Sequence, residues 1–305
     1  MRHWLAVAAL PLLLASCITP LPDITQSRSP CRLEPGGWCG FVREAAREAW
    51  PYAMLSSNAY LDDDEYAALP KSLVRREAAG NDSSGLAYLV FDRYALVDGE
   101  RGALAARVIA FRGTEFGSAA DIFRGSLGEG QRQGAQLVYA AERALLDAEG
   151  NSDVPIEVTG HSLGGALATQ ISIEFPEVRA FVFNTSPFFS GDPMMNDTNR
   201  LAISERGEFL RLLRRYKMTP AAEEVVINCN PSLTATKKHS IRALSDCLMW
   251  IAAYSDSEAY DLLGKDDDPV TKPEVECGGP GKAHPGPFVA TNEACVHAAR
   301  PKDDD

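Results

Sequence analysis

The fold of this chain is decided by one stretch, Ile156-Glu157-Val158-Thr159-Gly160-His161-Ser162-Leu163-Gly164-Gly165-Ala166-Leu167-Ala168. It begins with an apolar run typical of a β-strand, turns within Gly160–Gly164, and continues as an alanine-rich segment typical of a helix. A G-x-S-x-G sequence between a strand and a helix predicts a nucleophile elbow, a strained turn that exposes the serine hydroxyl. We therefore predict that Ser162 is a nucleophile. A glycine-rich turn that only joins two elements is the alternative interpretation.

Apolar β-type runs alternate with helical patterns along the chain. The predicted strands are 86–91 with 94–97, 104–111, 178–184, 201–204 and 225–228, in addition to the strand that precedes Ser162. The predicted helices are 41–60, 131–149, 208–216 and 241–263. This alternation predicts an α/β fold with a mostly parallel sheet and helices on both faces. Together with the elbow, it predicts an α/β-hydrolase domain over residues 41–264, followed by an acidic, Pro/Gly-rich tail over 265–305.

Charge and hydropathy exclude some classes of partner. The 305 residues carry a net charge of −12, and the sequence pI is about 5.0. An acidic chain of this kind is not expected to bind nucleic acid or to be drawn electrostatically to anionic lipid. No apolar run reaches the roughly 18 residues that a membrane-spanning helix needs.

The N-terminus predicts export. A short basic segment, Met1-Arg2-His3, precedes an apolar run that ends in Leu14-Ala15-Ser16-Cys17. This ending resembles a bacterial lipobox, which implies a signal peptide over residues 1–16, a lipid on Cys17 and a tether over residues 17–40. Ile18 in place of Asp after the cysteine suggests the outer membrane. An ordinary signal peptide, which would release the protein, is the alternative.

Six cysteines remain after Cys17, an even number that in an exported chain predicts disulfides. Closeness in sequence favours three pairs, Cys31–Cys39, Cys229–Cys247 and Cys277–Cys295. A metal site is the alternative, but the cysteines lack C-x-x-C spacing and histidine partners. We predict no metal and no cofactor.

A serine nucleophile needs a general base, and only five histidines are present. His3 belongs to the predicted signal peptide, His161 lies beside the serine, and His284 and His297 lie in the tail. His239 follows the last predicted strand, where an α/β hydrolase places its base. We therefore predict His239 as the base; a surface-loop histidine is the alternative.

The acid that orients the histidine should lie between the serine and the histidine in the chain. Glu205 stands at the carboxyl end of the predicted strand 201–204, so we predict Glu205 as this acid. Glu208, Asp192 and Asp197 remain alternatives. Asp192 and Asp197 fit turn chemistry, and Glu208 fits a helix start, where the helix dipole favours a carboxylate.

An oxyanion hole needs two N–H donors, one from Leu163, the residue after the nucleophile. The second should come from the end of an earlier strand. Phe111-Arg112-Gly113-Thr114 ends such a strand, and we predict Thr114 as the donor. An ordinary strand-ending turn is the alternative.

Two motifs together resemble the class 3 lipase family of α/β hydrolases. These are Val108-Ile109-Ala110-Phe111-Arg112-Gly113-Thr114 and the elbow, Val158 to Ala168. Phe183-Asn184-Thr185-Ser186-Pro187 occupies the place of the family's Phe-Gly-x-Pro strand end. The resemblance implies Ser162 as nucleophile, Thr114 and Leu163 at the oxyanion hole, and hydrolysis of lipid esters. The family's Asp after its next strand has no clear counterpart here.

Expected substrates are carboxylic esters of lipids, phospholipid or acylglycerol, reached through a lipid anchor at the membrane. Two segments are candidates for an acyl-chain site or lid, 115–131 with Phe123 and 186–199 with Phe188, Phe189, Met194 and Met195. Pinning of these side chains into the core is an equal alternative. The sequence also allows acyl transfer to another acceptor, thioester hydrolysis, or an inactive lipoprotein that uses the fold for binding.

Overall fold

The computed structural model describes residues 24–25, 34, 38–60, 69–81, 86–113, 129–211, 214, 221, 224–263 and 270–274. The described strands form one eight-stranded sheet in the order β1-β8-β7-β6-β5-β4-β3-β2. Their bounds are β1 Ile24–Thr25, β2 Leu73–Asn81, β3 Ala87–Val97, β4 Glu100–Phe111, β5 Ile156–His161, β6 Arg179–Phe183, β7 Arg200–Glu205 and β8 Glu224–Ile227. The strands from β4 to β8, with β1, are parallel, whereas β2, β3 and β4 pair antiparallel.

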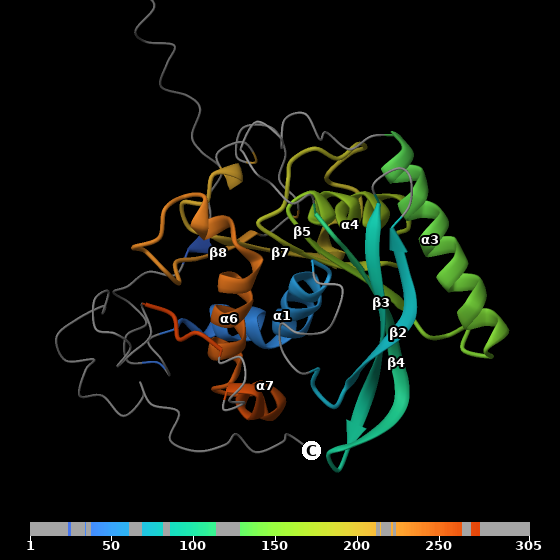
Figure 1. Cartoon of the computed structure of the whole chain (residues 1–305), viewed down its shortest axis with the longest axis horizontal. Coiled ribbons are helices and arrows are strands. Elements are labelled where there is room, and N and C mark those ends of the chain that lie inside the picture. The colour runs from blue at the N-terminus through green and yellow to red at the C-terminus, as the bar shows by residue number, and fades with distance from the viewer. Residues whose placement is uncertain are drawn as a thin grey trace, which may run out of the picture.

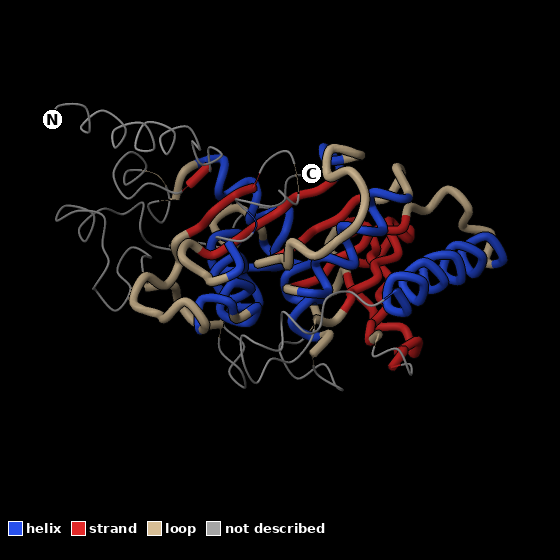
Figure 2. The backbone as a smooth tube through the Cα atoms, turned by 90° about the horizontal axis from the view of Figure 1, so that it is seen from above, coloured by secondary structure: helices blue, strands red, loops and turns tan. Residues whose placement is uncertain are grey.

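Helices cover both faces of the sheet. On one face α1 (Gly40–Asn58) packs against α6 (Ile241–Ala252), with α7 (Ser257–Leu263) beside α6. On the other face α3 (Glu129–Ala148) packs against α4 (Leu163–Glu174). Figure 1 shows α1 and α6 side by side, with α3 standing apart beside β2–β4, and Figure 2 shows the strands from above as a band among the helices. The predicted α/β-hydrolase fold is therefore confirmed.

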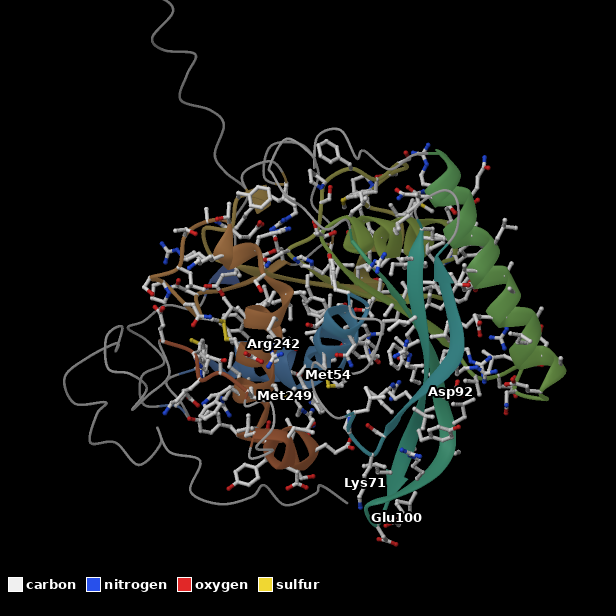
Figure 3. The ribbon with its side chains drawn as sticks, viewed as in Figure 1. Met54, Lys71, Asp92, Glu100, Arg242 and Met249 are labelled. Atoms are coloured by element: carbon white, nitrogen blue, oxygen red, sulfur yellow. A yellow bond between two sulfur atoms is a disulfide. The ribbon has the colours of Figure 1, made fainter. Side chains whose placement is uncertain are left out.

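Two apolar cores lie on the two sides of the sheet. The first is built by α1, α6 and the strands, and Met54 of α1 and Met249 of α6 are both fully buried in it (Figure 3). The second is built by α4, whose residues are buried all round except for the last, together with α3 and the opposite face of the strands. Every residue of β5 is buried, as expected for a strand with helices on both faces. The nucleophile segment is thus the most enclosed part of the sheet.

Several elements differ from their predicted bounds. The helix predicted over 41–60 is α1, which ends at Asn58 and continues through Pro51. The predicted helix 241–263 is two helices, α6 and α7. The predicted runs 86–91 and 94–97, which the pattern allows as a hairpin or as one kinked strand, form the single strand β3, and its register shifts at Tyr94. The sequence patterns do not predict β2 at all. The strand β1 lies within the stretch predicted as a tether.

A buried charge cluster fixes α3 against the antiparallel strands. Arg107 of β4 is fully buried, and its guanidinium contacts Asp92 of β3 at 2.9 Å, Glu142 at 3.2 Å and Glu149 at 2.9 Å. Asp92 is labelled in Figure 3 on the strands beside α3. A buried arginine needs carboxylates around it to offset the loss of hydration. These contacts therefore hold α3 against β3 and β4.

One predicted disulfide is present between described residues. Cys229 and Cys247 are bonded, and both are buried. The bond ties the segment after β8 to α6. Cys39 is also disulfide-bonded. Its predicted partner, Cys31, and the predicted pair Cys277–Cys295 lie outside the described residues, as does Cys17.

Candidate active site

Ser162 lies at the junction of β5 and α4 in a strained conformation. Its φ is 55° and its ψ is −121°, a backbone conformation that residues other than glycine rarely adopt. The turn is held in place by the end of β6, because the Ser162 N–H donates to the Phe183 carbonyl at 3.1 Å. The Ser162 carbonyl accepts from the Ser186 N–H at 2.9 Å. The predicted elbow geometry is therefore present.

The glycines of the motif are required by close approach. A Cβ on Gly160 would overlap the backbone carbonyl of Gly164. A Cβ on Gly164 would overlap the carbonyl oxygen of Phe111, at the end of β4. Any larger residue would push the elbow away from the sheet, so the glycines allow Ser162 to sit tightly between β4 and β6.

His239 contacts the nucleophile. It is the last residue of a short 3-10 helix, η3 (Lys237–His239), and Ser240 caps the start of α6 through a hydrogen bond from the Ala243 N–H at 3.4 Å. The Nε2 atom of His239 lies 3.0 Å from Ser162 Oγ. The structure thus brings together the two residues that the sequence predicts as nucleophile and base.

The acid beside His239 is Glu208, not Glu205. Oε2 of Glu208 lies 3.0 Å from His239 Nδ1 and accepts from the Leu210 N–H at 2.8 Å. Oε1 lies 2.6 Å from Nη2 of Arg214. Burial alone would raise the pKa of Glu208, but the Arg214 charge and His239 outweigh burial and lower the pKa below its ordinary value. Glu208 is therefore an anion that faces the histidine.

The predicted acid, Glu205, contacts the backbone after β8 and not the imidazole of His239. Its carboxylate accepts from the backbone N–H groups of Cys229 and Asn230, each at 3.1 Å. It therefore anchors the start of the segment that leads to His239, but it does not orient the imidazole. Burial raises the pKa of Glu205 to about 7 despite these two hydrogen bonds. The prediction fails because the chain turns at Arg206 and Gly207, where Gly207 has φ 85°, before the acid is reached.

The two aspartates that fit turn chemistry, Asp192 and Asp197, both lie in the segment between β6 and β7. The Asp192 carboxylate accepts from the Met194 N–H at 2.9 Å, and Asp197 opens the short 3-10 helix η2 (Asp197–Asn199). These local contacts are the turn chemistry that their sequence context predicts.

The two contacts of His239 fix its tautomer. A carboxylate can only accept, so Nδ1 carries the proton and donates to Glu208. In the neutral imidazole Nε2 is then the unprotonated nitrogen, which accepts the hydroxyl proton of Ser162. This is the arrangement in which an imidazole can remove a proton from a serine.

A second histidine, His161, supports the first, a role that no sequence pattern predicts. Its Nε2 lies 2.7 Å from the carbonyl oxygen of His239, and its Nδ1 lies 2.9 Å from the hydroxyl of Tyr60. The carbonyl can only accept, so Nε2 carries the proton and Nδ1 accepts from Tyr60. Burial, and then the nearby His239, lower the pKa of His161 well below its ordinary value. Only spatial adjacency reveals this role, because His161 is 78 residues from His239 in the chain.

One of the two predicted oxyanion donors is described. Leu163 is the first residue of α4, so its N–H has no acceptor within the helix and lies at the positive end of the helix dipole. The end of β4 lies against it, because a Cβ on Gly113 would be 3.4 Å from the Leu163 nitrogen. Thr114, the other predicted donor, lies outside the described residues.

The methionines of the predicted acyl-chain segment lie away from the nucleophile. The loop between β6 and β7 runs along α4. The Ser190 N–H donates to Gln170 Oε1 at 2.7 Å, and Asn196 Nδ2 donates to the Ser172 carbonyl at 2.9 Å. Met194 and Met195 are exposed beside the far end of α4, a helix that begins at the nucleophile. Their role in an acyl-chain site or lid stays a prediction.

Phe189, which belongs to the predicted acyl-chain segment, and Phe209, which does not, lie in different surroundings. Phe189 is buried in the core beside α4, as the alternative interpretation held. The ring of Phe209 is 4.6 Å from that of His239, a contact that no sequence pattern indicates. Residues 115–128, which hold most of the other predicted segment, lie outside the described residues.

The described part of the chain offers neither a metal cluster nor a spanning helix. Among its residues, no group of three His, Cys, Asp or Glu side chains could hold a metal ion. No helix in this part of the chain has the length and apolar character needed to cross a bilayer.

No protein-family model matches the chain, and a search of curated proteins finds no match. Several solved structures are similar to it, including the following two. Lipase II from Rhizopus niveus is 15% identical, with 55% of this chain and 74% of that chain covered and a TM-score of 0.39. A mutant form of MDLA from Penicillium cyclopium is 13% identical, with 66% of this chain and 85% of that chain covered and a TM-score of 0.45.

Proposed function

We propose that this protein is a serine ester hydrolase that acts on carboxylic esters of lipids, phospholipid or acylglycerol, through an acyl-enzyme on Ser162. The observation that carries the proposal is the continuous chain of contacts from Ser162 Oγ to His239 Nε2 at 3.0 Å and from His239 Nδ1 to Glu208 at 3.0 Å. The serine stands in a strained elbow at the start of a helix, where a nucleophile and an oxyanion donor meet.

Acylation begins when Ser162 Oγ attacks the ester carbonyl carbon. The hydroxyl proton passes to His239 Nε2, and the carbonyl π electrons move onto oxygen as the new C–O bond forms. The N–H of Leu163 and, as we propose, that of Thr114 stabilise this oxyanion. The intermediate then collapses, and His239 gives its proton to the departing alcohol. Glu208 stabilises the imidazolium and is not itself protonated.

Deacylation repeats the sequence with water. His239 removes a proton from water, the hydroxide attacks the acyl carbon, and Ser162 leaves as its alkoxide and recovers the proton from the imidazolium. The products are a carboxylic acid and the free enzyme, so the reaction needs no oxidant, reductant or added cofactor.

A lipid substrate and a membrane location are supported by sequence features. The residues before Cys17 resemble a lipobox, and a lipid on Cys17 would keep the enzyme at a bilayer. We infer a bacterial cell-envelope lipoprotein at the outer membrane, with lipid as its partner and no nucleic acid. The motifs at 108–114 and 158–168 support ester hydrolysis of lipid, because their resemblance is to class 3 lipases.

Rates of ester hydrolysis test the reaction. We expect wild type to hydrolyse p-nitrophenyl esters and to release fatty acid from phospholipid or acylglycerol emulsions, and we expect Ser162→Ala to do neither. A control variant is Ser172→Ala, which removes another buried serine hydroxyl from α4 and should keep its activity. Equal rates for wild type and Ser162→Ala would overturn the assignment of the nucleophile. Turnover of soluble esters without release of fatty acid from lipid would overturn the substrate class.

A fluorophosphonate reagent provides a second measurement that does not depend on the substrate. Wild type should be labelled at Ser162, and labelling should be lost in Ser162→Ala and slowed in a His239→Asn variant. The location is tested separately by palmitate labelling in cells. Incorporation of palmitate that survives Cys17→Ala would overturn the lipoprotein assignment without affecting the chemistry.

A further inference from the structure

We propose that Arg214 is a positioning residue of the triad, which fixes the Glu208 carboxylate as an anion with one oxygen turned toward His239. Its role rests on the function proposed above. The described contacts of the Arg214 guanidinium are with Glu208, Glu224, Ser204 and Thr185, and not with Ser162. It acts through Glu208, and no motif in the sequence points to it.

The Arg214 side chain is 1% exposed and contacts the ends of three neighbouring strands. Nη2 lies 2.6 Å from Glu208 Oε1, after β7. Nη2 also donates to Ser204 Oγ of β7 at 2.7 Å, and Nε donates to Glu224 Oε1 of β8 at 3.2 Å. Nη1 donates to the Thr185 carbonyl, after β6, at 2.6 Å. The guanidinium thus joins the carboxyl ends of β6 and β7, which lead to the site, to the first residue of β8.

The two oxygens of Glu208 have different partners: Oε2 is hydrogen-bonded, whereas Oε1 makes an ion pair with Arg214 without a hydrogen bond of good geometry. Oε2 receives the Leu210 N–H and His239 Nδ1, whereas Oε1 faces Arg214. A glutamate side chain has one more rotatable bond than an aspartate and, without a second contact, could turn away from the imidazole. The Arg214 contact removes that freedom, which allows a glutamate on a turn beyond the strand to replace an acid at the strand end.

Charge balance gives Arg214 a second effect. Two buried carboxylates, Glu208 and Glu224, face its guanidinium, and the imidazole of His239, with that of His161 4.6 Å beyond it, lies on the other side of Glu208. Of the charges named here, Arg214 is the cation in direct contact with both carboxylates. Without it, Glu208 would take up a proton more easily and could not stabilise the imidazolium.

The planar guanidinium is needed, and a lysine could not replace it. Arg214 donates through three nitrogens in different directions, to Glu224, to Ser204 and to Thr185. A lysine ammonium is a single charged centre and would satisfy only part of this set. The link to Thr185 also reaches the elbow, because the next residue, Ser186, donates to the Ser162 carbonyl.

The test compares Arg214→Met and Arg214→Lys with a matched control, Arg200→Met. Arg200 is likewise buried in this half of the sheet, but its guanidinium contacts Ser172, Pro193 and Met195, away from the triad. We expect Arg214→Met to lower kcat/KM on a p-nitrophenyl ester by about 100-fold, below the roughly 10⁴-fold cost of losing a triad acid. Arg214→Lys should lie between wild type and Arg214→Met, and Arg200→Met should stay near wild type.

A purely structural role would not move the pH profile. In Arg214→Met the acid limb of the kcat/KM profile should shift upward by about one pH unit, because Glu208 loses the cation that favours its charged form. Added guanidinium ion should restore part of the activity of Arg214→Met and none to Glu208→Gln. In the double variant, the loss should not exceed that of Glu208→Gln alone. A folded Arg214→Met with a wild-type rate and acid limb, or losses that multiply in the double variant, would overturn the proposal.

A spectroscopic readout separates this proposal from the proposed function. The His239 Nδ1 proton should give a strongly downfield NMR signal in wild type, which Arg214→Met should weaken or move upfield. If wild type hydrolysed no ester, the hydrolase assignment would fail, while this signal would still decide the role of Arg214. If Arg214→Met did not fold, the Arg214→Lys variant would decide: a wild-type rate and an unchanged signal in that variant would count against the proposal, because lysine keeps the charge but loses the planar set of donors.

Discussion

The Nε2–H of His161 donates to the backbone carbonyl of His239 across 2.7 Å, so the residue that precedes the nucleophile also holds the base. The other nitrogen of His161 accepts from Tyr60, after the end of α1. Nucleophile and base are therefore positioned by one imidazole that must remain neutral, because a protonated Nδ1 could not accept from the tyrosine.

We expect His161 to remain neutral when ordinary histidines protonate. Its pKa is lowered in the native state, so below about pH 6.5 the unfolded chain binds a proton at this site that the native chain does not. Its contribution to stability is therefore present above that pH and is lost as the pH falls. The measurement is nitrogen NMR of labelled histidine, with His161→Gln as the assignment control. An imidazolium signal from His161 at pH 6 would contradict this expectation.

Replacement of the two glutamates should separate their roles. Glu208→Gln should lower kcat by roughly 10³- to 10⁴-fold, because the amide cannot stabilise the imidazolium. Glu205→Gln should keep most of the activity, because Glu205 contacts only backbone N–H groups near Cys229. Steady-state hydrolysis of a soluble ester measures both. The reverse order of effects would restore Glu205 as the orienting acid.

Glu205 should make the protein less stable as the pH rises. Its pKa is raised from 4.5 to about 7 in the native state, so between these values the native chain holds a proton that the unfolded chain has lost. The protonated form therefore stabilises the fold fully below pH 4.5, and this contribution is lost as the pH rises through about 7. The total is about 3 kcal/mol. Urea unfolding of wild type and Glu205→Gln across this range should show the difference; parallel curves would contradict it.

Gly164→Ala should abolish the fold around the elbow. The added methyl group would overlap the Phe111 carbonyl, and an overlap with backbone cannot be relieved by moving a side chain. We expect a loss of at least about 3 kcal/mol in unfolding free energy, together with loss of activity. Gly40→Ala is the control, because a Cβ there would meet only the end of Arg43 at 3.9 Å. Similar melting temperatures for the two variants would show that the elbow is not as tightly packed as described.

The sequence was sufficient where local pattern determines geometry. The elbow could be predicted because only glycine fits at Gly160 and Gly164 and because a strand and a helix flank them. His239 could be predicted because histidines are few and chain order limits the choice. The β2 strand could not be predicted because its apolar start, Leu73-Val74, is followed at once by the charged run Arg75-Arg76-Glu77, which an edge strand tolerates.

The orienting acid could not be chosen from the sequence because its position depends on a turn. The orienting acid is expected at the carboxyl end of a strand, which is the position of Glu205. The turn at Arg206 and Gly207 brings Glu208 to the imidazole instead. Long-range contacts were equally hidden. His161 acts on a residue 78 positions away, whereas the Arg214–Glu208 contact follows no helical or strand spacing.

The position of β1 limits the distance between the nucleophile segment and Cys17. Ile24 pairs with Val225, and the register continues across β7 and β6 to His161, so all of them lie in one row of the sheet. That row places Ile24 four strand spacings, about 19 Å, from the nucleophile segment. Cys17 is at most about 25 Å further along the extended chain. If Cys17 carries the lipid, as we propose, the nucleophile segment can lie no more than about 45 Å from the anchoring leaflet. The seven residues of chain before β1 set this limit.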